Sequence, residues 1–208
     1  NILSENIQNK DLEDAITYAN IIHKATKQTL KTLVSLLQWA FTGANSSTFN
    51  PVTLAPKELV DEVLEFLTVH FIKKKLLIKN RIAPNIRIEA DKNMLTSIFR
   101  NLISNAIEYC TADGEITIAL QSKNNAVQVS VSDTGVGIAT EALENIFEPG
   151  EIINRVGTAQ EKGTGLGLQI CKALVDRHEG KIWIESEIGV GTTCYFTLSK
   201  IEIDERKE

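Results

Sequence analysis

The chain has 208 residues, a formal net charge of −5 at pH 7 and 43% hydrophobic residues, which is typical of a soluble globular protein with one domain and an appendage, or with two small domains. The negative charge argues against non-specific binding to nucleic acid or to an anionic membrane, and no run of about 18 apolar residues predicts a membrane span. The three cysteines are scattered, lack the spacing of metal ligands and predict reduced, mostly buried thiols in a cytosolic protein.

The first part of the chain predicts one long helix. Over residues 12–41 the apolar positions follow alternating steps of four and three, as in the heptad seam of a coiled coil, and no Pro or Gly interrupts them. Such a helix is about 45 Å long and needs a partner helix, in a hairpin or a dimer, to bury its apolar stripe. His23 and Thr26 place polar groups in this seam. We interpret His23 as part of a core layer that sets the register, with a phosphate-acceptor role as the alternative.

Composition divides the chain into segments. Residues 43–53 are rich in small and polar residues and predict a linker. We therefore expect a helical segment over 1–48, a compact domain over 49–202 and a charged tail over 203–208, with fraying from Glu202 onward. Because the sequence starts without Met and without a signal-peptide pattern, we also expect a fragment of a longer protein.

The compact domain begins with two predicted helices. Pro56 suits the first turn of a helix over 56–72, and Asp91 suits the N-cap of a helix over 92–109. We interpret the lysines at 73–75 as a solvated charge run. Short strands are predicted between the two helices, over 76–81 and 85–88.

The rest of the domain predicts an antiparallel sheet. Ile116, Ile118 and Leu120 alternate with other residues, which indicates a strand with one face on the core. The further predicted elements are a hairpin over 114–121 and 126–132, helices over 139–146 and 165–178, and a hairpin over 181–185 and 192–198. This order predicts an α+β fold, a two-layer sandwich in which helices cover one face of a mixed, mostly antiparallel sheet, preceded by the coiled-coil-like helix.

Polar residues mark two candidate ligand contacts. Asn101, Asn105 and Glu108 are spaced four and three apart, so they share one stripe of the helix over 92–109. This stripe faces either a ligand or solvent. Asp133 ends a predicted strand and is followed by two closely spaced glycines. A partly buried carboxylate there needs hydrogen-bond donors, and the exocyclic amine of adenine is a suitable one; a turn or N-cap aspartate is the alternative.

The segment Gly163–Leu168 predicts a phosphate contact. Its small residues let the backbone approach an anion, and a helix predicted from about Gly165 offers N–H groups and the positive end of its dipole. Thr164 adds a hydroxyl, and a tight turn is the alternative. The segment is not a P-loop, because the lysine pattern of that motif is absent, and it is not a dinucleotide fingerprint, because no strand directly precedes it.

Together these motifs resemble those of sensor histidine kinases, in that family's order and approximate spacing over residues 50–200. The wider family, called GHKL, includes gyrase, MutL repair proteins and heat-shock chaperones, and the resemblance implies its Bergerat-type ATP-binding fold. Leu30–Ala40 resembles the second helix of the dimerisation and histidine-phosphotransfer hairpin. The matching motifs are the N box at Asn101–Tyr109, the first glycine box at Asp133–Gly137, the F box at Ile146–Pro149, the second glycine box at Gly163–Leu168 and the small-residue turn at Gly189–Thr193.

The resemblance implies a site for ATP and Mg²⁺. Asn105 would hold Mg²⁺ through its amide oxygen, and Asn101 would support the phosphates. Asp133 would accept the adenine amino group, with Tyr109 beside the ring, and residues 149–163 would form a lid. The implied ATP-binding residues are Asn101, Asn105, Glu108, Tyr109, Asp133, Gly135, Gly137, Ile138, Phe147, Arg155, Lys162, Gly163, Thr164, Gly165, Leu166, Gly167, Leu168 and Thr193, of which Arg155 and Lys162 are the lid cations that would reach the γ-phosphate.

Three departures from the family pattern bear on this reading. The phosphoacceptor histidine box is absent, and the family's spacing places it before Asn1. Glu108 stands where many members carry Lys, so a phosphate contact is lost or inverted there. Gly150 replaces the second aromatic residue of the F box, and the lid is short.

The resemblance implies the catalytic region of a sensor histidine kinase, which transfers the γ-phosphate of ATP to a histidine upstream of this chain for relay to a response-regulator aspartate. The implied partners are a second copy through the N-terminal helices, a response-regulator receiver domain and an upstream sensor domain. Neither nucleic acid nor membrane contact is expected for this part of the chain, and its implied location is the cytoplasm, with membrane anchoring open for the full-length protein. One alternative is a non-catalytic dimeric scaffold with a vestigial nucleotide site. Another, an ATPase of the chaperone or gyrase branch, lacks support because nothing resembles their catalytic glutamate.

Overall fold

The computed structural model describes residues 17–19, 21–23, 25–26, 29, 33, 49–123, 126–147, 167–198 and 201–203. Those before residue 49 are all helical, in agreement with the helix predicted there. The rest of that predicted helix lies outside the described residues. His23 is exposed in the single chain, so its place in a seam between helices stays a prediction.

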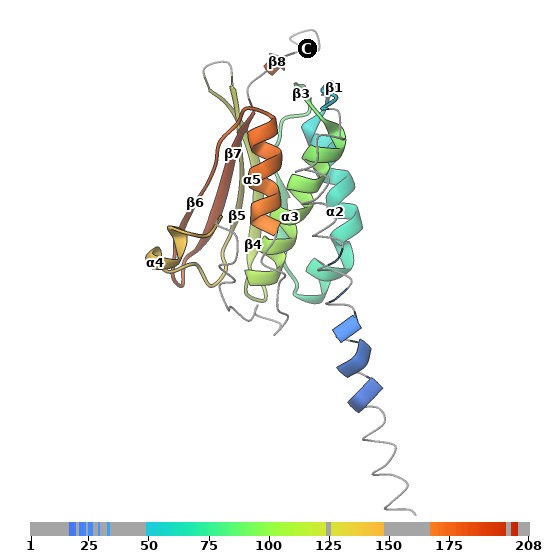
Figure 1. Cartoon of the computed structure of the whole chain (residues 1–208), viewed down its shortest axis with the longest axis vertical. Coiled ribbons are helices and arrows are strands. Elements are labelled where there is room, and N and C mark those ends of the chain that lie inside the picture. Colours follow the sequence, from blue (N-terminus) through green and yellow to red (C-terminus); the bar gives the residue numbers. More distant parts are fainter. Residues whose placement is uncertain are drawn as a thin grey trace, which may run out of the picture.

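A five-stranded sheet forms one layer of the domain (Figure 1). Its strand order is β2-β4-β5-β7-β6; β2 and β4 are parallel, and the other neighbours are antiparallel. The mixed, mostly antiparallel sheet that alternation predicted is thereby confirmed. The strands are β2 (Leu77–Asn80), β4 (Glu115–Lys123), β5 (Ala126–Asp133), β6 (Ile182–Glu187) and β7 (Gly191–Leu198).

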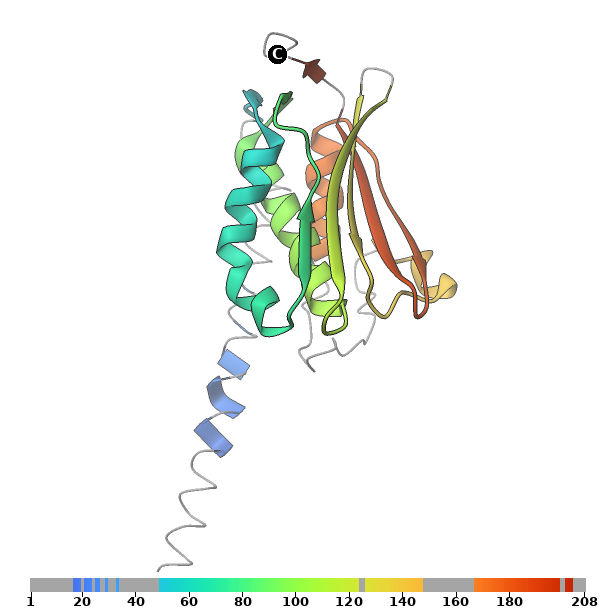
Figure 2. The same ribbon diagram turned by 180° about the vertical axis from the view of Figure 1, so that it is seen from behind.

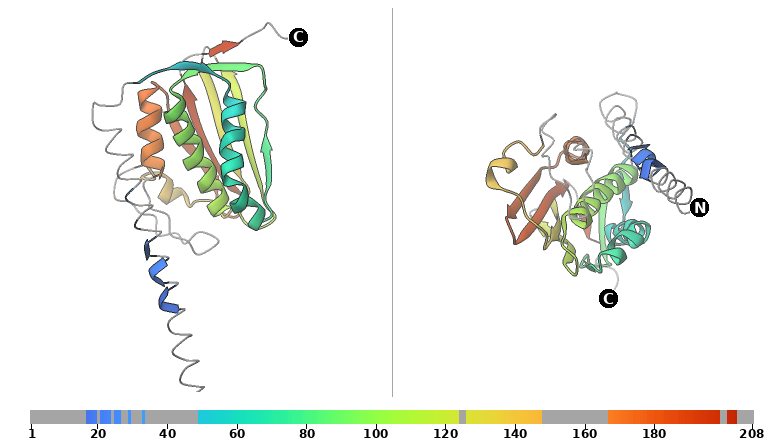
Figure 3. Two further views of the ribbon diagram at one scale, coloured as in Figure 1. Left: turned by 90° about the vertical axis from the view of Figure 1, so that its right-hand side faces the viewer. Right: turned by 90° about the horizontal axis from the view of Figure 1, so that it is seen from below.

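Helices form the second layer and cover one face of this sheet (Figure 1, Figure 3). α3 (Lys92–Tyr109) lies between α2 (Pro56–Lys73) and α5 (Gly167–Arg177), and the short α4 (Thr140–Leu143) lies beside β6. The two-layer α+β architecture is confirmed, and α3 has the predicted bounds. The helix predicted over 139–146 is wrong in length, because only four of those residues are helical.

A second, three-stranded sheet was not predicted. β3 (Ile86–Ala90) lies between β1 (Val52–Leu54) and β8 (Ile201–Ile203), and all pairs are antiparallel (Figure 2). The predicted linker over 43–53 is therefore wrong at its end, and the tail predicted from Glu202 is wrong for its first two residues. Both errors have the same cause, since strands of three residues are stabilised by pairing with β3, which is distant in sequence.

The core lies between the helices and the five-stranded sheet. Ile98 and Phe99 of α3 are fully buried, and the ring of Phe99 meets Phe196 of β7 edge-on, with centroids 5.8 Å apart. Ile116 and Ile118 are buried on the inner face of β4 as predicted, and all three cysteines are buried and free as predicted. Because one stripe of α3 is locked in this core, the polar stripe beside it has a fixed orientation.

The start of α3 is capped as predicted. Asp91 Oδ1 accepts hydrogen bonds from the backbone N–H groups of Asn93 and Met94, both at 3.0 Å, and Oδ2 accepts from Asn50 at 3.1 Å. Behind the cap, Nε2 of the buried His178 accepts from the N–H of Asp91, while Nδ1 donates to the Leu174 carbonyl. This arrangement ties the chain entering the domain, and the end of α5, to the beginning of α3.

The lysines at 73–75 are not a uniform solvated run. Lys73 and Lys75 are exposed, but Lys74 is half-buried, and its ammonium group donates hydrogen bonds to backbone carbonyls at the end of α3. The prediction is therefore wrong for Lys74. The reason is that the acceptors lie more than 30 residues away along the chain, where local sequence gives no sign of them.

Candidate functional site

The candidate site is built around Asp133, the last residue of β5. Its backbone pairs with Thr192 of β7, and its carboxylate accepts a hydrogen bond from the Gly135 N–H at 2.8 Å. Burial raises the pKa of this carboxyl from 3.8 to about 6, although the N–H groups of Gly135 and Thr192 act in the opposite direction. The predicted partly buried carboxylate is confirmed, and such a group gains from a further hydrogen-bond donor.

The two glycines after Asp133 allow close backbone contacts. A Cβ atom on Gly135 would lie 2.3 Å from the Tyr109 carbonyl oxygen, and one on Gly137 would lie 1.9 Å from the Glu187 carbonyl oxygen. Gly137 also has a φ of +69°, which favours glycine. The N–H of Val136 donates to the Tyr109 carbonyl at 3.2 Å. The glycine segment is thus clamped between the end of α3 and the turn from β6 to β7.

Two hydroxyl groups that sequence reasoning overlooked support this segment. Ser186 Oγ accepts from the Ile138 N–H at 2.8 Å and donates to the Gly191 carbonyl at 2.8 Å, so it bridges the glycine segment and the start of β7. Only the strand register brings Ser186 there, so no local signal could have identified it. The hydroxyl of Thr192 lies 2.8 Å from that of Ser186. The predicted Thr193 is on the opposite face of β7 from Thr192 and the buried Cys194, and its hydroxyl lies 2.9 Å from that of Ser132.

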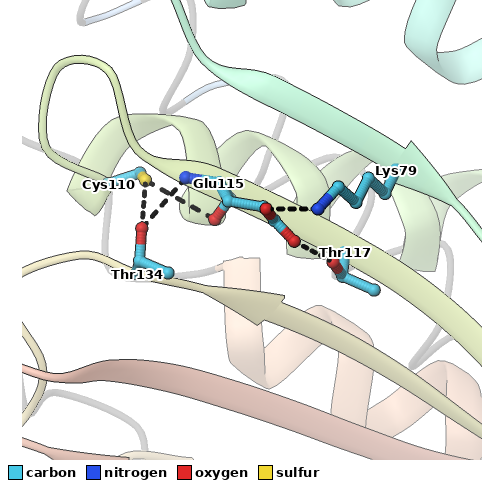
Figure 4. Close-up of polar contacts among 5 residues, drawn as sticks. All are labelled: Lys79, Cys110, Glu115, Thr117 and Thr134. Carbon is cyan, nitrogen blue, oxygen red and sulfur yellow. Dashed lines mark hydrogen bonds and ion pairs between the residues drawn. The ribbon is translucent and has the colours of Figure 1, made fainter.

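The second of these supporting hydroxyl groups belongs to Thr134 (Figure 4). Its hydroxyl accepts from the Glu115 N–H at 2.9 Å and lies 3.8 Å from the Cys110 sulfur. The Glu115 carboxylate in turn pairs with Lys79 of β2 and accepts from Thr117 at 3.1 Å. Its pKa is lowered, mainly by the Lys79 hydrogen bond. The network joins the glycine segment, the end of α3 and the edge of the sheet.

The opposite end of the site is formed by α3 and α5. Asn101 Oδ1 lies 3.0 Å from where a Cβ of Gly167 would stand, and Asn101 Nδ2 donates to the Ser97 carbonyl at 2.9 Å. Asn101 and Tyr109 are eight residues apart on α3, about 12 Å along the helix axis. α3 therefore joins the two glycine motifs, with Asn101 next to the second and Tyr109 next to the first. Asn105 lies between them and is half-buried.

The remaining predicted residues divide into two groups. Ile138, Phe147, Leu168 and Glu108 are half-buried in the described part of the chain. The others lie outside the described residues, so the predictions made for them stand untested: Arg155, Lys162, Gly163, Thr164, Gly165 and Leu166. Within the described ranges no group of three or more His, Cys, Asp or Glu side chains is placed to hold a metal ion.

Comparison with known proteins agrees with this geometry. Residues 90–202 match the family described as "Histidine kinase-, DNA gyrase B-, and HSP90-like ATPase". A similar protein is the adaptive-response sensory kinase SasA of Synechocystis sp. (strain ATCC 27184 / PCC 6803 / Kazusa), 38% identical over 147 residues, which cover 70% of this chain and 38% of SasA. The sensor histidine kinase WalK of Bacillus subtilis (strain 168) is 28% identical over 193 residues, which cover 92% of this chain and 31% of WalK.

Solved structures also resemble this chain. The nucleotide-free catalytic domain of histidine kinase ThkA matches with a TM-score of 0.63 and 30% identity, over 73% of this chain and 96% of that domain. ThkA in complex with the response regulator TrrA matches with a TM-score of 0.69 and 26% identity, over 91% of this chain and 52% of that one. The resemblance of the motifs to sensor histidine kinases is confirmed, and the ATPase family match supports ATP as the ligand.

Two further findings bear on the extent of the protein. The matched region spans less than half the length of both SasA and WalK. Among the residues that the structure describes, no helix is both long and apolar enough to cross a membrane.

Proposed function

We propose, since this chain belongs to the family of histidine kinase-, DNA gyrase B- and HSP90-like ATPases, that it is the ATP-binding catalytic region of a sensor histidine kinase. The γ-phosphoryl group of ATP passes to a histidine upstream in the full-length protein, and from there to an aspartate of a response regulator. The kinases SasA, WalK and ThkA, to which the chain is similar, support this branch of the family.

The observation that carries the proposal is the environment of Asp133. Its carboxylate is partly desolvated and accepts backbone N–H groups, yet its pKa remains raised to about 6. An adenine amino group would supply the donor that compensates the cost of burial. The closely packed glycine segment and the adjacent Tyr109 offer the ring a platform, which supports this place for the adenine end of the nucleotide.

The phosphate end is assigned to Asn101, Asn105 and the beginning of α5. Phosphoryl transfer needs mainly positioning and charge neutralisation from the protein, and Mg²⁺ takes most of its ligands from phosphates and water, so a single amide oxygen from Asn105 suffices. Helix N-termini favour anions, which suits phosphates near Gly167. Arg155, Lys162 and Gly163–Leu166, all outside the described residues, are proposed to line the phosphates, with the two cations directed to the γ-phosphate.

The proposed partners follow from the N-terminal segment and from ThkA. The heptad pattern over residues 12–41 supports a homodimer, because an isolated apolar stripe needs a partner helix. ThkA has been solved in complex with the response regulator TrrA, which supports a receiver domain as the partner of this chain. An upstream sensor domain completes the proposed protein.

The test has two arms. Isothermal titration calorimetry of the chain with ATP, with and without Mg²⁺, measures binding at the proposed site. Incubation of the full-length protein with γ-labelled ATP measures transfer, which should yield an acid-labile, base-stable phosphohistidine. Absence of ATP binding would refute the proposal, whereas binding without any transfer would favour the alternative of a scaffold with a vestigial site.

A further inference from the structure

The side chain of Lys74, the residue that follows α2, ends among three backbone carbonyl oxygens. Its ammonium nitrogen lies 2.6 Å from the Ile107 carbonyl, 2.7 Å from that of Glu108 and 3.2 Å from that of Cys110. A lysine ammonium has three N–H donors, so every donor has a backbone acceptor. The backbone takes part as well, because the Lys74 carbonyl accepts from the Asp113 N–H at 3.0 Å.

These bonds complete the last turn of α3. The final carbonyls of any helix lack partners within the helix. Here the Ala106 carbonyl accepts from the Cys110 N–H, and the Tyr109 carbonyl accepts from the Val136 N–H. The two carbonyls between them, together with that of Cys110, accept from the Lys74 ammonium group. Each carbonyl of the last turn therefore has a donor, and Lys74 serves two of these four carbonyls as well as that of Cys110.

The charge of Lys74 suits this position. A helix C-terminus carries the negative end of the helix dipole, which favours a cation, and hydrogen bonds from charged donors are stronger than those from neutral ones. Lys73 and Lys75, which are exposed, carry the same charge nearby without these contacts. The specific feature of Lys74 is thus its set of three bonds and not the general charge of the segment.

The turn held by Lys74 is also the platform of the adenine end. Tyr109 lies in it, its carbonyl receives the Val136 N–H, and Gly135 lies so close to the same carbonyl that no Cβ would fit. We propose that Lys74 is a positioning residue for nucleotide binding, which sets the last turn of α3 so that Tyr109 and the glycine segment after Asp133 keep the geometry that adenine needs. This inference rests on the proposed function.

The decisive variant is Lys74→Met, which keeps the aliphatic stem and removes the donors. We expect its affinity for ADP, measured by calorimetry on the whole chain well below the melting temperature, to fall about tenfold, which corresponds to about 1.4 kcal/mol. The same factor is expected with and without Mg²⁺, because the adenine end and not the metal is disturbed. Lys74→Arg, which retains charged donors, should restore at least half of the lost binding free energy.

Two controls separate positioning from loss of stability. Lys73→Met removes an exposed charge next to Lys74 and should leave ADP affinity unchanged. Val127→Ala removes core packing at the start of β5, the opposite end of that strand from Asp133; it should lower the melting temperature without changing ADP affinity. Hydrogen exchange at the Val136 amide should be faster in Lys74→Met than in Val127→Ala.

The outcomes are distinct. If the unmodified chain binds no ADP, the proposed function fails. If it binds and Lys74→Met binds equally well while only its melting temperature falls, Lys74 is purely structural and the inference is overturned. Should Lys74→Met not fold, Lys74→Gln, which keeps two donors without the charge, decides by the same comparison of affinities.

Discussion

The two ends of α3 serve the nucleotide site in different ways. At the adenine end the contacts are backbone contacts: the Tyr109 carbonyl receives the Val136 N–H, and Gly135 and Gly137 lie directly against carbonyl oxygens. At the phosphate end, among the described residues, the site consists of amide side chains, and Asn101 Oδ1 lies next to α5 at Gly167. The adenine end is therefore preorganised by backbone contacts of the fold, whereas the described part of the phosphate end offers amide side chains that suit phosphates and a metal ion.

The largest effect is expected at Gly135, where the neighbouring backbone leaves no room for a side chain. Gly135→Ala places a methyl group 2.3 Å from the Tyr109 carbonyl oxygen, so the segment must shift away from α3. Overpacking of this kind costs about 1–3 kcal/mol of unfolding free energy. Because the shift displaces the adenine platform, ATP affinity should fall by more than about 100-fold, or about 2.7 kcal/mol. Chemical denaturation and calorimetry measure the two quantities.

Gly180→Ala is the matched control for Gly135→Ala. A Cβ atom on Gly180 would lie 1.9 Å from the Thr197 carbonyl oxygen, near the end of β7 that is remote from Thr192 and Asp133. The substitution should cost about 1–3 kcal/mol of unfolding free energy through the same kind of overpacking, with ATP affinity unchanged. Equal losses of affinity in both variants would contradict the view that packing against Tyr109 is what matters.

Asp133→Asn should separate stability from binding. Removing the charge should weaken ATP binding by about 100-fold, since a donor–acceptor pair becomes a clash of donors. The ligand-free protein should become more stable at pH 8, by up to about 3 kcal/mol, because the pKa of this carboxyl is raised by about two units and each is worth about 1.4 kcal/mol. On one preparation, thermal denaturation tests the expected gain in stability and calorimetry tests the expected loss of ATP affinity. A variant that is less stable and binds normally would disprove the assignment of Asp133.

The adenine end was also the part most accessible from sequence. Asp133 and its glycines are local turn chemistry, and α3 was predicted with the observed bounds because its N-cap, Asp91, precedes an unbroken helical period. Lys74 and Ser186 were not predicted, because their partners lie at Ile107 and Ile138, far away along the chain. In the sequence, Lys74 is one of three consecutive lysines and Ser186 is a serine in a strand, so both look like surface residues. Only the tertiary structure shows their partners.

The same limit explains the second sheet. β1 and β8 have three residues each and no independent hydrophobic pattern, so they exist only through their register with β3. Such pairings over long sequence distance leave no periodic signal. The assignment of residues to layers was predictable, whereas the contacts that fix the site's platform were not.

At the phosphate end, Asn105→Ala should affect only the metal-dependent part of binding. We expect Mg·ATP affinity to fall by about 10- to 100-fold, as is usual for disturbed metal sites, while ADP affinity without Mg²⁺ stays the same. Calorimetry with and without Mg²⁺ measures the difference. A matched change at Thr96, a half-buried residue of α3 whose hydroxyl donates to the Lys92 carbonyl of the same helix, should leave the affinity unchanged. Loss of affinity in the absence of Mg²⁺ would show that the two ends are not independent.

The pH dependence of ATP binding should contain a contribution from the adenine end. The folded pKa of Asp133, about 6, lies above its ordinary value of 3.8. The ionised carboxylate therefore costs stability above about pH 6, and this cost is relieved as the pH falls from about 6 toward 3.8. Binding needs the ionised form, so ATP affinity should drop about tenfold at pH 5 relative to its plateau, and binding near pH 6 should release protons. Calorimetry in two buffers of different ionisation enthalpy detects this release. Because the terminal phosphate of ATP also titrates near pH 6, the contribution of Asp133 is the part of the release that is lost in Asp133→Asn.

The smallest effect belongs to the start of α3, beyond the phosphate end. Asp91→Ala removes the cap of Asn93 and Met94 and the acceptor of the Asn50 N–H, which should cost about 1–2 kcal/mol of unfolding free energy. Asp91→Asn retains a capping oxygen and should cost much less. Since ten residues of helix, about 15 Å, separate this cap from Asn101, ATP affinity should change less than twofold in both variants. A larger change would mean that α3 transmits strain along its whole length, so that neither end of the site is set by its local contacts.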